Sequence, residues 1–273
     1  MKNIHKMLHG IFFFLVLTFV SSAFAHQPRI TNQWTNQVID PEISKAYYAQ
    51  LPGEPQKYII EATGSFNLYV NILVPDIIGQ KKDVTAIIFK NGDYTHPIIT
   101  LGGLNAPWKY MFEPFGYDAY WQWAEYKSKA SSGTYEIQVS SPDNMSKYSL
   151  AVGEIENFDV HETLNALKLV PQLKRDFFNE SPRNFLFSPM GYWTILIEFL
   201  VAWILIFILR FFAKKLWIES FQNWSKNSRR LVGFTWWLLA VLLFIVTIST
   251  SWNLWLLFGA GLCFFEAILG GYW

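Results

Sequence analysis

The chain has little cysteine, little histidine and no excess of charge of one sign. Its 273 residues include one cysteine, Cys263, which lies in an apolar run near the carboxyl end. A single cysteine excludes a disulfide framework within the chain, a Cys-x-x-Cys redox site, a thiolate zinc site and haem attached through cysteines. The 22 basic and 21 acidic residues give a net charge of +1, whereas nucleic-acid-binding surfaces are basic and clustered. We therefore expect no nucleic-acid partner.

The sequence also lacks the short motifs of the common enzyme classes. It contains no Gly-x-Ser-x-Gly nucleophile turn, no glycine-rich nucleotide loop and no His-Glu-x-x-His zinc helix. Three histidines follow residue 25, namely His26, His96 and His161. With so few candidate bases, nucleophilic catalysis has little support, and we predict that the chain is not an enzyme.

Apolar residues are what the sequence has in abundance, at 52% of the chain. The first 25 residues combine a basic start, the apolar run 11–20 and the small-x-small pattern Ala23-Phe24-Ala25. These are the three parts of a secretory signal, and the apolar run is shorter than the roughly 20 residues of a membrane span. We predict a signal peptide over 1–25, cleaved after Ala25.

Three long apolar runs follow near the carboxyl end, at 192–213, 231–250 and 253–271. Each is long enough to cross a bilayer as a helix, so the sequence predicts a three-helix transmembrane anchor. The loop 214–230 is basic, and the positive-inside rule places it in the cytoplasm. We therefore expect a bacterial inner-membrane protein with residues 26–191 extracytoplasmic and the carboxyl terminus cytoplasmic.

The exported segment 26–157 is predicted to be mostly β. The runs 66–74, 133–140 and 147–154 alternate with the period of a half-buried strand. In the first run, the set expected to face inward is Phe66, Leu68, Val70, Ile72 and Val74, and the set expected to face outward is Asn67, Tyr69, Asn71 and Leu73. About seven such strands, separated by turn residues, are typical of an antiparallel β-sandwich or jelly-roll. Asp40-Pro41-Glu42 resembles a helix start, so we also expect one or two helical turns over 41–48.

The segment 158–191 connects this domain to the first apolar run. Within 160–179, apolar residues recur at helical spacing around Pro171. This pattern predicts an amphipathic helix that packs on the sandwich or lies on the membrane surface. The rest is a short linker, which keeps the domain close to the bilayer.

Two strand sequences late in the domain, GTYEIQV and KYSLAVGE, resemble the end of the pre-peptidase C-terminal type of β-sandwich. The chain as a whole is similar to a group of bacterial exported, membrane-anchored proteins in its HQPRI start, NLYVNILVPDI strand, EPFG loop and AVGE ending. The resemblance implies the sandwich fold and a non-enzymatic role. It implies no catalytic residues.

A free amino-terminal His26 would be a candidate metal ligand. Its α-amine and imidazole together would form a two-nitrogen chelate suited to copper, completed by an imidazole from His96 or His161. This arrangement resembles the histidine brace of copper-dependent lytic polysaccharide monooxygenases and periplasmic copper-resistance β-sandwiches, of which the chain matches the His26 position alone. The alternative is that His26 begins a terminus without a metal.

An aromatic stretch over 107–126 is the second candidate site. Exposed aromatic side chains interleaved with acids could contact a small ligand or a partner protein. The candidates are Trp108, Tyr110, Phe115, Tyr117, Trp121 and Trp123. The alternatives are packing within the domain, with alternate residues in its core, and contact with lipid headgroups.

Charged residues inside the apolar runs are the third candidate. Glu198 lies about 9 Å and Glu266 about 20 Å below the outer ends of their helices, so a shared ion site is not expected. Arg210 falls within reach of Glu266, which predicts a structural ion pair. A transport role for Glu198 and Glu266 is a further alternative.

Together these patterns predict an integral membrane protein whose extracytoplasmic domain binds, senses or assists without catalysis. Its expected partners are the lipid bilayer and another membrane protein, and its small ligand is not defined by the sequence. Copper handling through His26 and a role as a small transport component are the alternatives.

Overall fold

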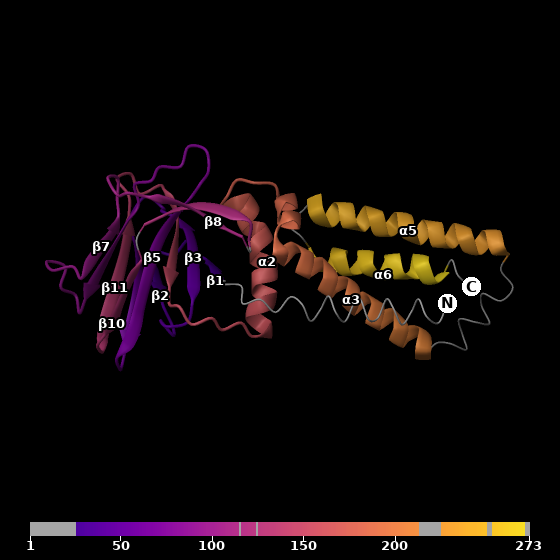
Figure 1. Ribbon diagram of the computed structural model, residues 1–273, viewed down its shortest axis with the longest axis horizontal. Helices are drawn as coiled ribbons and strands as arrows, with labels where there is room; N and C mark the ends of the chain where they lie inside the picture. Colours follow the sequence, from indigo (N-terminus) through magenta and orange to yellow (C-terminus); the bar gives the residue numbers. More distant parts are fainter. Residues whose placement is uncertain (1–25, 115, 124, 213–224, 250–252, 271–273) are drawn as a thin grey trace.

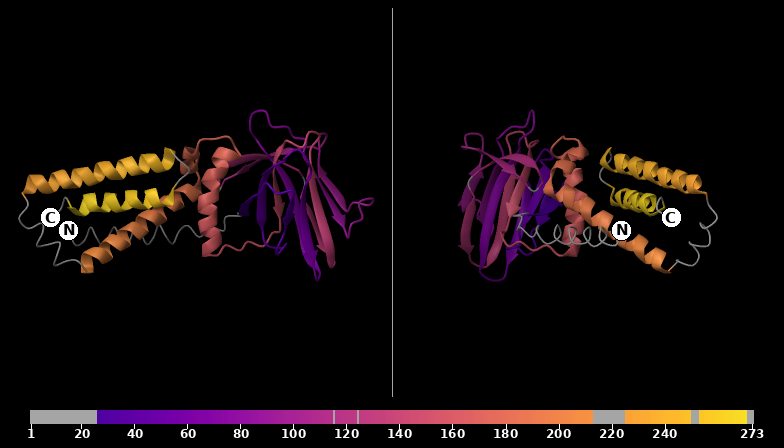
Figure 2. Two further views of the ribbon diagram at one scale, coloured as in Figure 1. Left: turned by 180° about the vertical axis from the view of Figure 1, so that it is seen from behind. Right: turned by 45° about the vertical axis from the view of Figure 1, so that its right-hand side comes forward.

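The computed structural model describes residues 26–114, 116–123, 125–212, 225–249 and 253–270. A two-sheet sandwich lies at one end of an elongated molecule and long helices lie at the other (Figure 1). Helix α2, Val160–Asp176, lies between them and runs across the long direction of the other helices, as both views in Figure 2 also show. The predicted signal peptide and most of the predicted basic loop fall outside the described residues.

The larger sheet has seven strands, in the order β1-β3-β12-β5-β9-β8, with β10 also pairing with β5. Strand β12 therefore lies in the middle of the sheet, between two strands from the first third of the chain. The strands are β1 Gln27–Ile30, β3 Lys45–Gln50, β5 Phe66–Pro75, β8 Lys109–Glu113, β9 Asp118–Gln122, β10 Tyr126–Ala130 and β12 Lys147–Val152.

The smaller sheet has five strands in the order β2-β4-β11-β6-β7. Its strands are β2 Thr35–Gln37, β4 Gln56–Ala62, β6 Thr85–Lys90, β7 Ile99–Gly102 and β11 Gly133–Ser140. The described residues thus form twelve strands rather than about seven. Both sheets are mixed, because β1 pairs parallel with β3 and β2 pairs parallel with β4. The expected antiparallel sandwich is confirmed for the other strand pairs and wrong for these two, since the two edge strands are too short to show an alternating pattern.

The expectation of helical turns over 41–48 was also wrong, because this region leads into strand β3. Asp40 has a φ of 50°, which is the left-handed region rather than the extended backbone of a helix N-cap. Strand β3 pairs with β1 on one side and with β12 on the other. Pairing on both sides outweighs the local helix signals.

The main core lies between the two sheets and comes from alternate strand residues. In β5 the predicted inward set is buried throughout, from Phe66 at 7% exposure to Val70 at 0%. Two tyrosines bring hydroxyl groups into this core: Tyr58 Oη lies 2.8 Å from Tyr148 Oη, and the Tyr148 hydroxyl donates to Gln56 Oε1 at 2.6 Å. These two hydroxyl groups and the Gln56 side chain therefore satisfy one another.

Helix α2 begins at an N-cap, where the Asp159 carboxylate accepts from the backbone N–H of Glu162 at 2.7 Å. The helix continues through Pro171. It contributes to two apolar clusters beyond the main core. The sandwich cluster joins Leu173, Phe177 and Phe178 to the outer face of the larger sheet, and the helical cluster joins Ala166 and Leu167 to the segments that follow.

Those segments are η1 Pro182–Phe187, α3 Pro189–Phe212, α5 Lys226–Ser249 and α6 Leu254–Gly270. The helical cluster takes Phe185 from η1, Met190 from α3 and Leu257 from α6. Helices α3 and α6 approach closely, since a Cβ added to Gly261 would lie 2.9 Å from the Cβ of Ala202.

Two described helices, rather than three, have the length and apolar character that a membrane crossing requires. They are α3, through Pro189–Ile206, and α5, through Arg230–Ser249. Helix α6 is apolar but has 17 residues, about 25 Å at about 1.5 Å per residue, against a hydrocarbon thickness of about 30 Å. The expected third span over 253–271 is therefore shorter than predicted, since the helix starts at Leu254 and its described part ends at Gly270.

Candidate functional site

The carboxyl end of α2 holds a buried ion pair against the sandwich. The Lys174 side chain is fully buried and its ammonium donates to Asp118 Oδ1 at 2.5 Å. It also donates to the backbone carbonyl of Tyr117 at 2.8 Å, and Glu180 Oε2 lies 3.9 Å away. Asp118 begins strand β9, so this pair links the larger sheet directly to the helix that leads to the apolar segments.

The turn between β8 and β9 is shaped around this ion pair. Tyr117 has a φ of 60°, a conformation that non-glycine residues rarely adopt, and its carbonyl is the one that accepts from Lys174. The backbone N–H of Gly116 donates to Glu113 Oε2 at 2.6 Å. A Cβ on Gly116 would lie 2.6 Å from Asp118 Oδ2 and 2.9 Å from Glu113 Oε2. The turn thus brings two carboxylates together beside one buried ammonium.

The electrostatics of the pair are set by its burial. Desolvation raises the pKa of Asp118 to about 7, the nearby ammonium of Lys174 opposes this, and the carboxylates of Glu113 and Glu180 add to it. Burial likewise raises the pKa of Tyr120, whose hydroxyl lies 3.3 Å from that of Tyr48. The carboxyl end of α2 therefore lies against a β9 carboxyl group whose pKa burial raises toward neutrality.

A second lysine closes the same end of the helix. Lys147 Nζ donates to the carbonyls of Asp176 and Phe177 at 2.8 and 2.9 Å and to Asn179 Oδ1 at 2.9 Å. Carbonyls at a helix carboxyl end have no partner within the helix and attract cations. Lys147 lies at the start of β12, so the sandwich caps α2.

The amino end of α2 is held by a different and more open contact. Arg29 of β1 donates from Nη1 and Nη2 to the two Glu162 oxygens, at 2.8 and 2.7 Å. These side chains remain 28% and 17% exposed. Nearby, the Gln27 side-chain amide donates to the Asn157 carbonyl. The contacts tie the first turn of α2 to an edge strand.

The three histidines of the predicted copper site lie on three different segments of the fold. His26 precedes β1, where its ring pairs with the Ser44 hydroxyl. Burial, which disfavours the charged imidazolium, lowers the pKa of His26, and the Glu125 carboxylate acts in the opposite direction. His96 lies in the loop between β6 and β7, 3.0 Å from Asp93 Oδ2, and His161 lies in the first turn of α2. Among the described residues no group of three or more His, Cys, Asp or Glu is placed to hold a metal ion. Copper binding stays a prediction.

The aromatic stretch divides between the core and the surface. Trp108 and Trp123 pack against the main core, and the Trp108 indole donates to the Gly103 carbonyl at 3.0 Å. The Trp121 indole donates to Asp76 Oδ1 at 2.9 Å. Tyr110 and Tyr117 are 55% and 49% exposed, and Phe115 lies outside the described residues. The exposed members gather at the β8–β9 hairpin, beside the buried ion pair.

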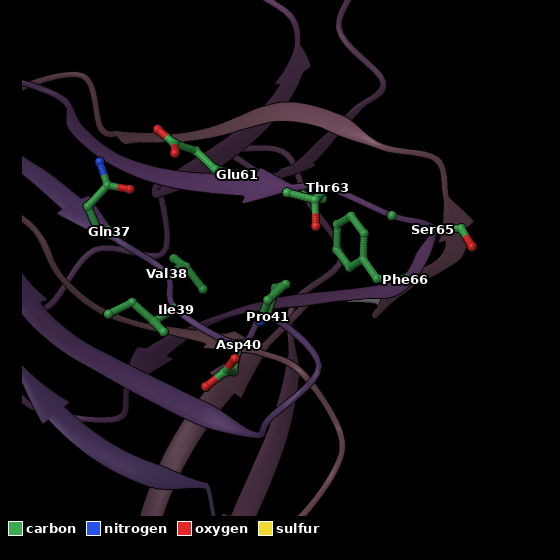
Figure 3. A pocket seen from close by; sticks show the side chains of 11 residues that line it. Gln37, Val38, Ile39, Asp40, Pro41, Glu61, Thr63, Ser65 and Phe66 are labelled. Carbon is green, nitrogen blue, oxygen red and sulfur yellow. The ribbon is translucent and has the colours of Figure 1, made fainter.

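The surface also carries a shallow pocket of about 680 Å³ between the β2–β3 connection and the β4–β5 hairpin. Figure 3 shows the carboxylates of Glu61 and Asp40 on two sides of it, with Thr63 and Phe66 between them. Strand β5 starts at this pocket and ends beside β9. Strand β5 has ten residues and therefore spans about 33 Å between the pocket and β9. The pocket and the β8–β9 hairpin are therefore separate sites.

The predicted membrane charges lie on two helices. Glu198 belongs to α3 and Glu266 to α6. Gly261 packs beside the turn of Glu198, since a Cβ there would lie 3.7 Å from the Glu198 carbonyl oxygen. Glu266 follows five residues later, about 8 Å further along α6. The side chain of Arg210 lies outside the described residues, so its pairing with Glu266 stays a prediction.

Sequence reasoning missed the buried ion pair, although a signal was present. Lys174 lies four residues after Val170 and three before Phe177, which places a cation on the apolar face of the predicted amphipathic helix. A lysine at such a position is rarely buried without a partner. The partner could not be named, because Asp118 is 56 residues away in the sequence.

No protein-family model matches the chain, and no curated protein matches it. Among solved structures, the pre-peptidase C-terminal domain of a collagenase from Bacillus anthracis is similar over 45% of this chain and 96% of that chain, with 11% identity and a TM-score of 0.29. A β-glucosidase from Kluyveromyces marxianus is similar over 43% of this chain, with 16% identity and a TM-score of 0.19. A cycloisomaltooligosaccharide glucanotransferase from Paenibacillus sp. is similar over 48%, with 15% identity and a TM-score of 0.18. The chain spans 12% and 15% of the length of these two enzymes. Likenesses of this extent assign no activity to it.

Proposed function

We propose that the chain is a membrane-anchored protein whose β-sandwich is a non-enzymatic binding, sensing or accessory domain. In this proposal residues 26–191 lie outside the bacterial inner membrane, the carboxyl terminus is cytoplasmic, and the partner is another membrane protein. The sandwich presents its binding surface at a fixed position relative to the bilayer.

The observation that carries the proposal is that α2 belongs to both the sandwich cluster and the helical cluster. Leu173 and Phe177 pack on the larger sheet, and Ala166 and Leu167 pack with η1, α3 and α6. A helix that packs into both clusters couples two units far more firmly than an exposed linker would. An event at the sandwich surface would therefore act on the helices through α2.

The membrane part of the proposal is supported by the poor burial of the long helices. Only 28% of the apolar window in α3 and 17% of that in α5 are buried within the chain. The core helix of a globular protein would bury most of such a surface, whereas lipid leaves it uncovered by protein.

The β8–β9 hairpin is the surface that we assign to the partner. Tyr110, Phe112 and Tyr117 are all at least 44% exposed, and aromatic side chains are enriched where proteins bind one another. Asp118, next to Tyr117, holds Lys174. A partner on this hairpin would thus bind within one residue of the contact that fixes α2.

Cysteine labelling in intact cells tests the orientation. In a Cys263→Ala background, Ser128→Cys lies on the exposed β10 and Ser225→Cys lies just before α5. A membrane-impermeant maleimide should label the first in intact cells and the second only after permeabilisation. Equal labelling of both in intact cells would contradict the orientation.

Photo-crosslinking tests the partner surface. A photoreactive phenylalanine analogue at Tyr117 should give a crosslink to another membrane protein, whereas the same group at Ser128 should give none. Absence of any Tyr117 adduct in cells where the protein is correctly oriented would remove the hairpin as the binding surface.

A further inference from the structure

The amino-terminal half of α2 carries an apolar stripe that the protein does not cover. Val160 and Leu164 are 77% and 53% exposed, whereas Leu167 is 7% exposed. The spacing of these three residues places them on one face of the helix. Leu167 packs in the helical cluster with Phe185 and Leu257. Val160 and Leu164 therefore face the same direction as Leu167. They lie about 10 and 5 Å closer to the amino end of the helix.

That direction is the one in which the membrane-crossing helices extend. Figures 1 and 2 show α2 lying across α3, α5 and α6, which all extend on the side away from the sandwich. Among the described residues, α2 meets the helical cluster through Ala166, Leu167 and Val170. The turns before these residues continue past this contact, with their apolar side chains on the side where the bilayer would lie.

Exposed residues of η1 and α3, which pack with α2 in the helical cluster, and of α2 itself have the chemistry of a lipid interface. Phe187 at the end of η1 and Tyr192 in the first turns of α3 are 60% and 59% exposed, and aromatic residues are enriched at headgroup level. Lys168 follows Leu164 by one turn and is exposed. Basic residues beside an apolar stripe are typical of helices that lie on anionic membranes.

We infer that the amino-terminal half of α2 lies in the lipid headgroup layer, with Val160 and Leu164 inserted toward the acyl chains. The occupant of this face is phospholipid rather than a second protein, because the face is continuous with helices whose own surface is left uncovered. This inference rests on the proposed membrane anchoring and adds to it a surface contact that fixes the tilt of the sandwich.

Site-directed fluorescence tests the inference on the full chain. The Cys263→Ala protein is reconstituted in vesicles of phosphatidylcholine and phosphatidylglycerol in equal parts. A polarity-sensitive fluorophore is attached at Leu164→Cys, at Asn165→Cys as the neighbour on a different face, or at Ser128→Cys on the sandwich. Quenching is measured with aqueous iodide and with lipids carrying a nitroxide near the headgroup.

We expect the Leu164 label to show blue-shifted emission, loss of iodide quenching and strong quenching by the nitroxide lipid. The Ser128 label should show the reverse, and the Asn165 label should be less protected from iodide than the Leu164 label. A Leu164 label as open to iodide as Ser128 would overturn the inference. A Leu164 label shielded from both quenchers would also overturn it, because a protein would then cover the face.

Failure of the proposed function gives a different result. Resistance of the chain to alkaline carbonate extraction is measured on the same vesicles, and its loss would contradict membrane anchoring itself. A chain that stays in the membrane while its Leu164 label is open to iodide keeps the anchor and loses only the surface contact.

Discussion

The two ends of α2 are attached to the sandwich in different ways. At the carboxyl end, Lys174 is fully buried against Asp118 and three aromatic or aliphatic side chains pack on the sheet. At the amino end, Arg29 and Glu162 pair at the surface and the neighbouring apolar residues are uncovered. The carboxyl end is thus held by buried contacts, whereas the amino end is held by surface contacts and leaves an apolar face, to which we assign lipid.

Of the changes at the two ends of α2, removal of the buried Lys174 ammonium should lower the free energy of unfolding most. Lys174→Met leaves Asp118 buried beside Glu113 and Glu180 without its ammonium partner. We expect a loss of about 3–5 kcal/mol in the free energy of unfolding, measured by denaturant titration of the purified full chain in detergent micelles. Lys168→Met, on an exposed turn of the same helix, should change it by at most about 0.5 kcal/mol. Equal stability of the two variants would show that the two ends of α2 are held alike.

The next largest effect should be the pH dependence of the free energy of unfolding that comes from Asp118, at the carboxyl end of α2. The pKa of Asp118 rises from 3.8 to about 7 on folding, so the folded chain binds this proton more tightly than the unfolded chain. The resulting stabilisation is fully present below the unfolded pKa and is lost as the pH rises through the folded value. Asp118→Asn replaces this carboxyl group with an amide, which does not titrate. The stability of the wild type relative to this variant should therefore fall as the pH rises from about 4 to about 7 and level off above that, measured by denaturant titration at a series of pH values. A difference that stays constant would contradict the assignment.

Breaking the ion pair at the amino end should cost less. Arg29→Ala removes two charge-assisted hydrogen bonds between partly exposed side chains, so we expect a loss of about 1 kcal/mol. Hydrogen exchange should become faster in the first turn of α2 and stay unchanged in the last. Arg175→Ala, which removes a pair with Asp176 whose side chains are 51% and 48% exposed, is the control. Faster exchange at both ends would mean that the helix is attached as one unit.

The smallest effect on stability should come from the uncovered stripe. Leu164→Ser should change the free energy of unfolding in micelles by about 0.5 kcal/mol or less, because the side chain is exposed. Leu167→Ala, one turn later on the same face, should cost about 2–5 kcal/mol because that side chain is buried in the helical cluster. A comparable cost for both would place Leu164 in a packed protein contact and sharpen the search for what covers it.

Alternating strands with strong patterns were predictable from the sequence, and strands defined by their partners were not. In β5 the set Phe66, Leu68, Val70, Ile72 and Val74 is buried as predicted. Tyr69 and Leu73 were expected to face outward but are also buried, because α2 covers that side of the sheet. Strand β3 was missed because its pairing on both sides cannot be read from a local window.

The site was less predictable than the fold. The sequence shows where aromatic residues are concentrated, but it does not show which of them are buried. Trp108 and Trp123 pack on the core, whereas Tyr110 and Tyr117 are exposed. The amphipathic helix was expected, but its ion pair joins residues 56 positions apart. Long-range electrostatic contacts depend on the folded topology, which a single sequence does not specify.

The central place of β12 in the larger sheet has a consequence for how the domain folds. Lys147 of β12 pairs with Gln50 of β3, so about 100 residues of chain must be brought together to close the sheet, at an entropic cost that grows with loop length. Until Lys147–Val152 has been synthesised, β3 and β5 each lack a neighbour. Folding dominated by such distant pairings is slow. A chain arrested before β12 would therefore expose two unpaired strand edges, which are the surfaces on which partly folded β proteins associate.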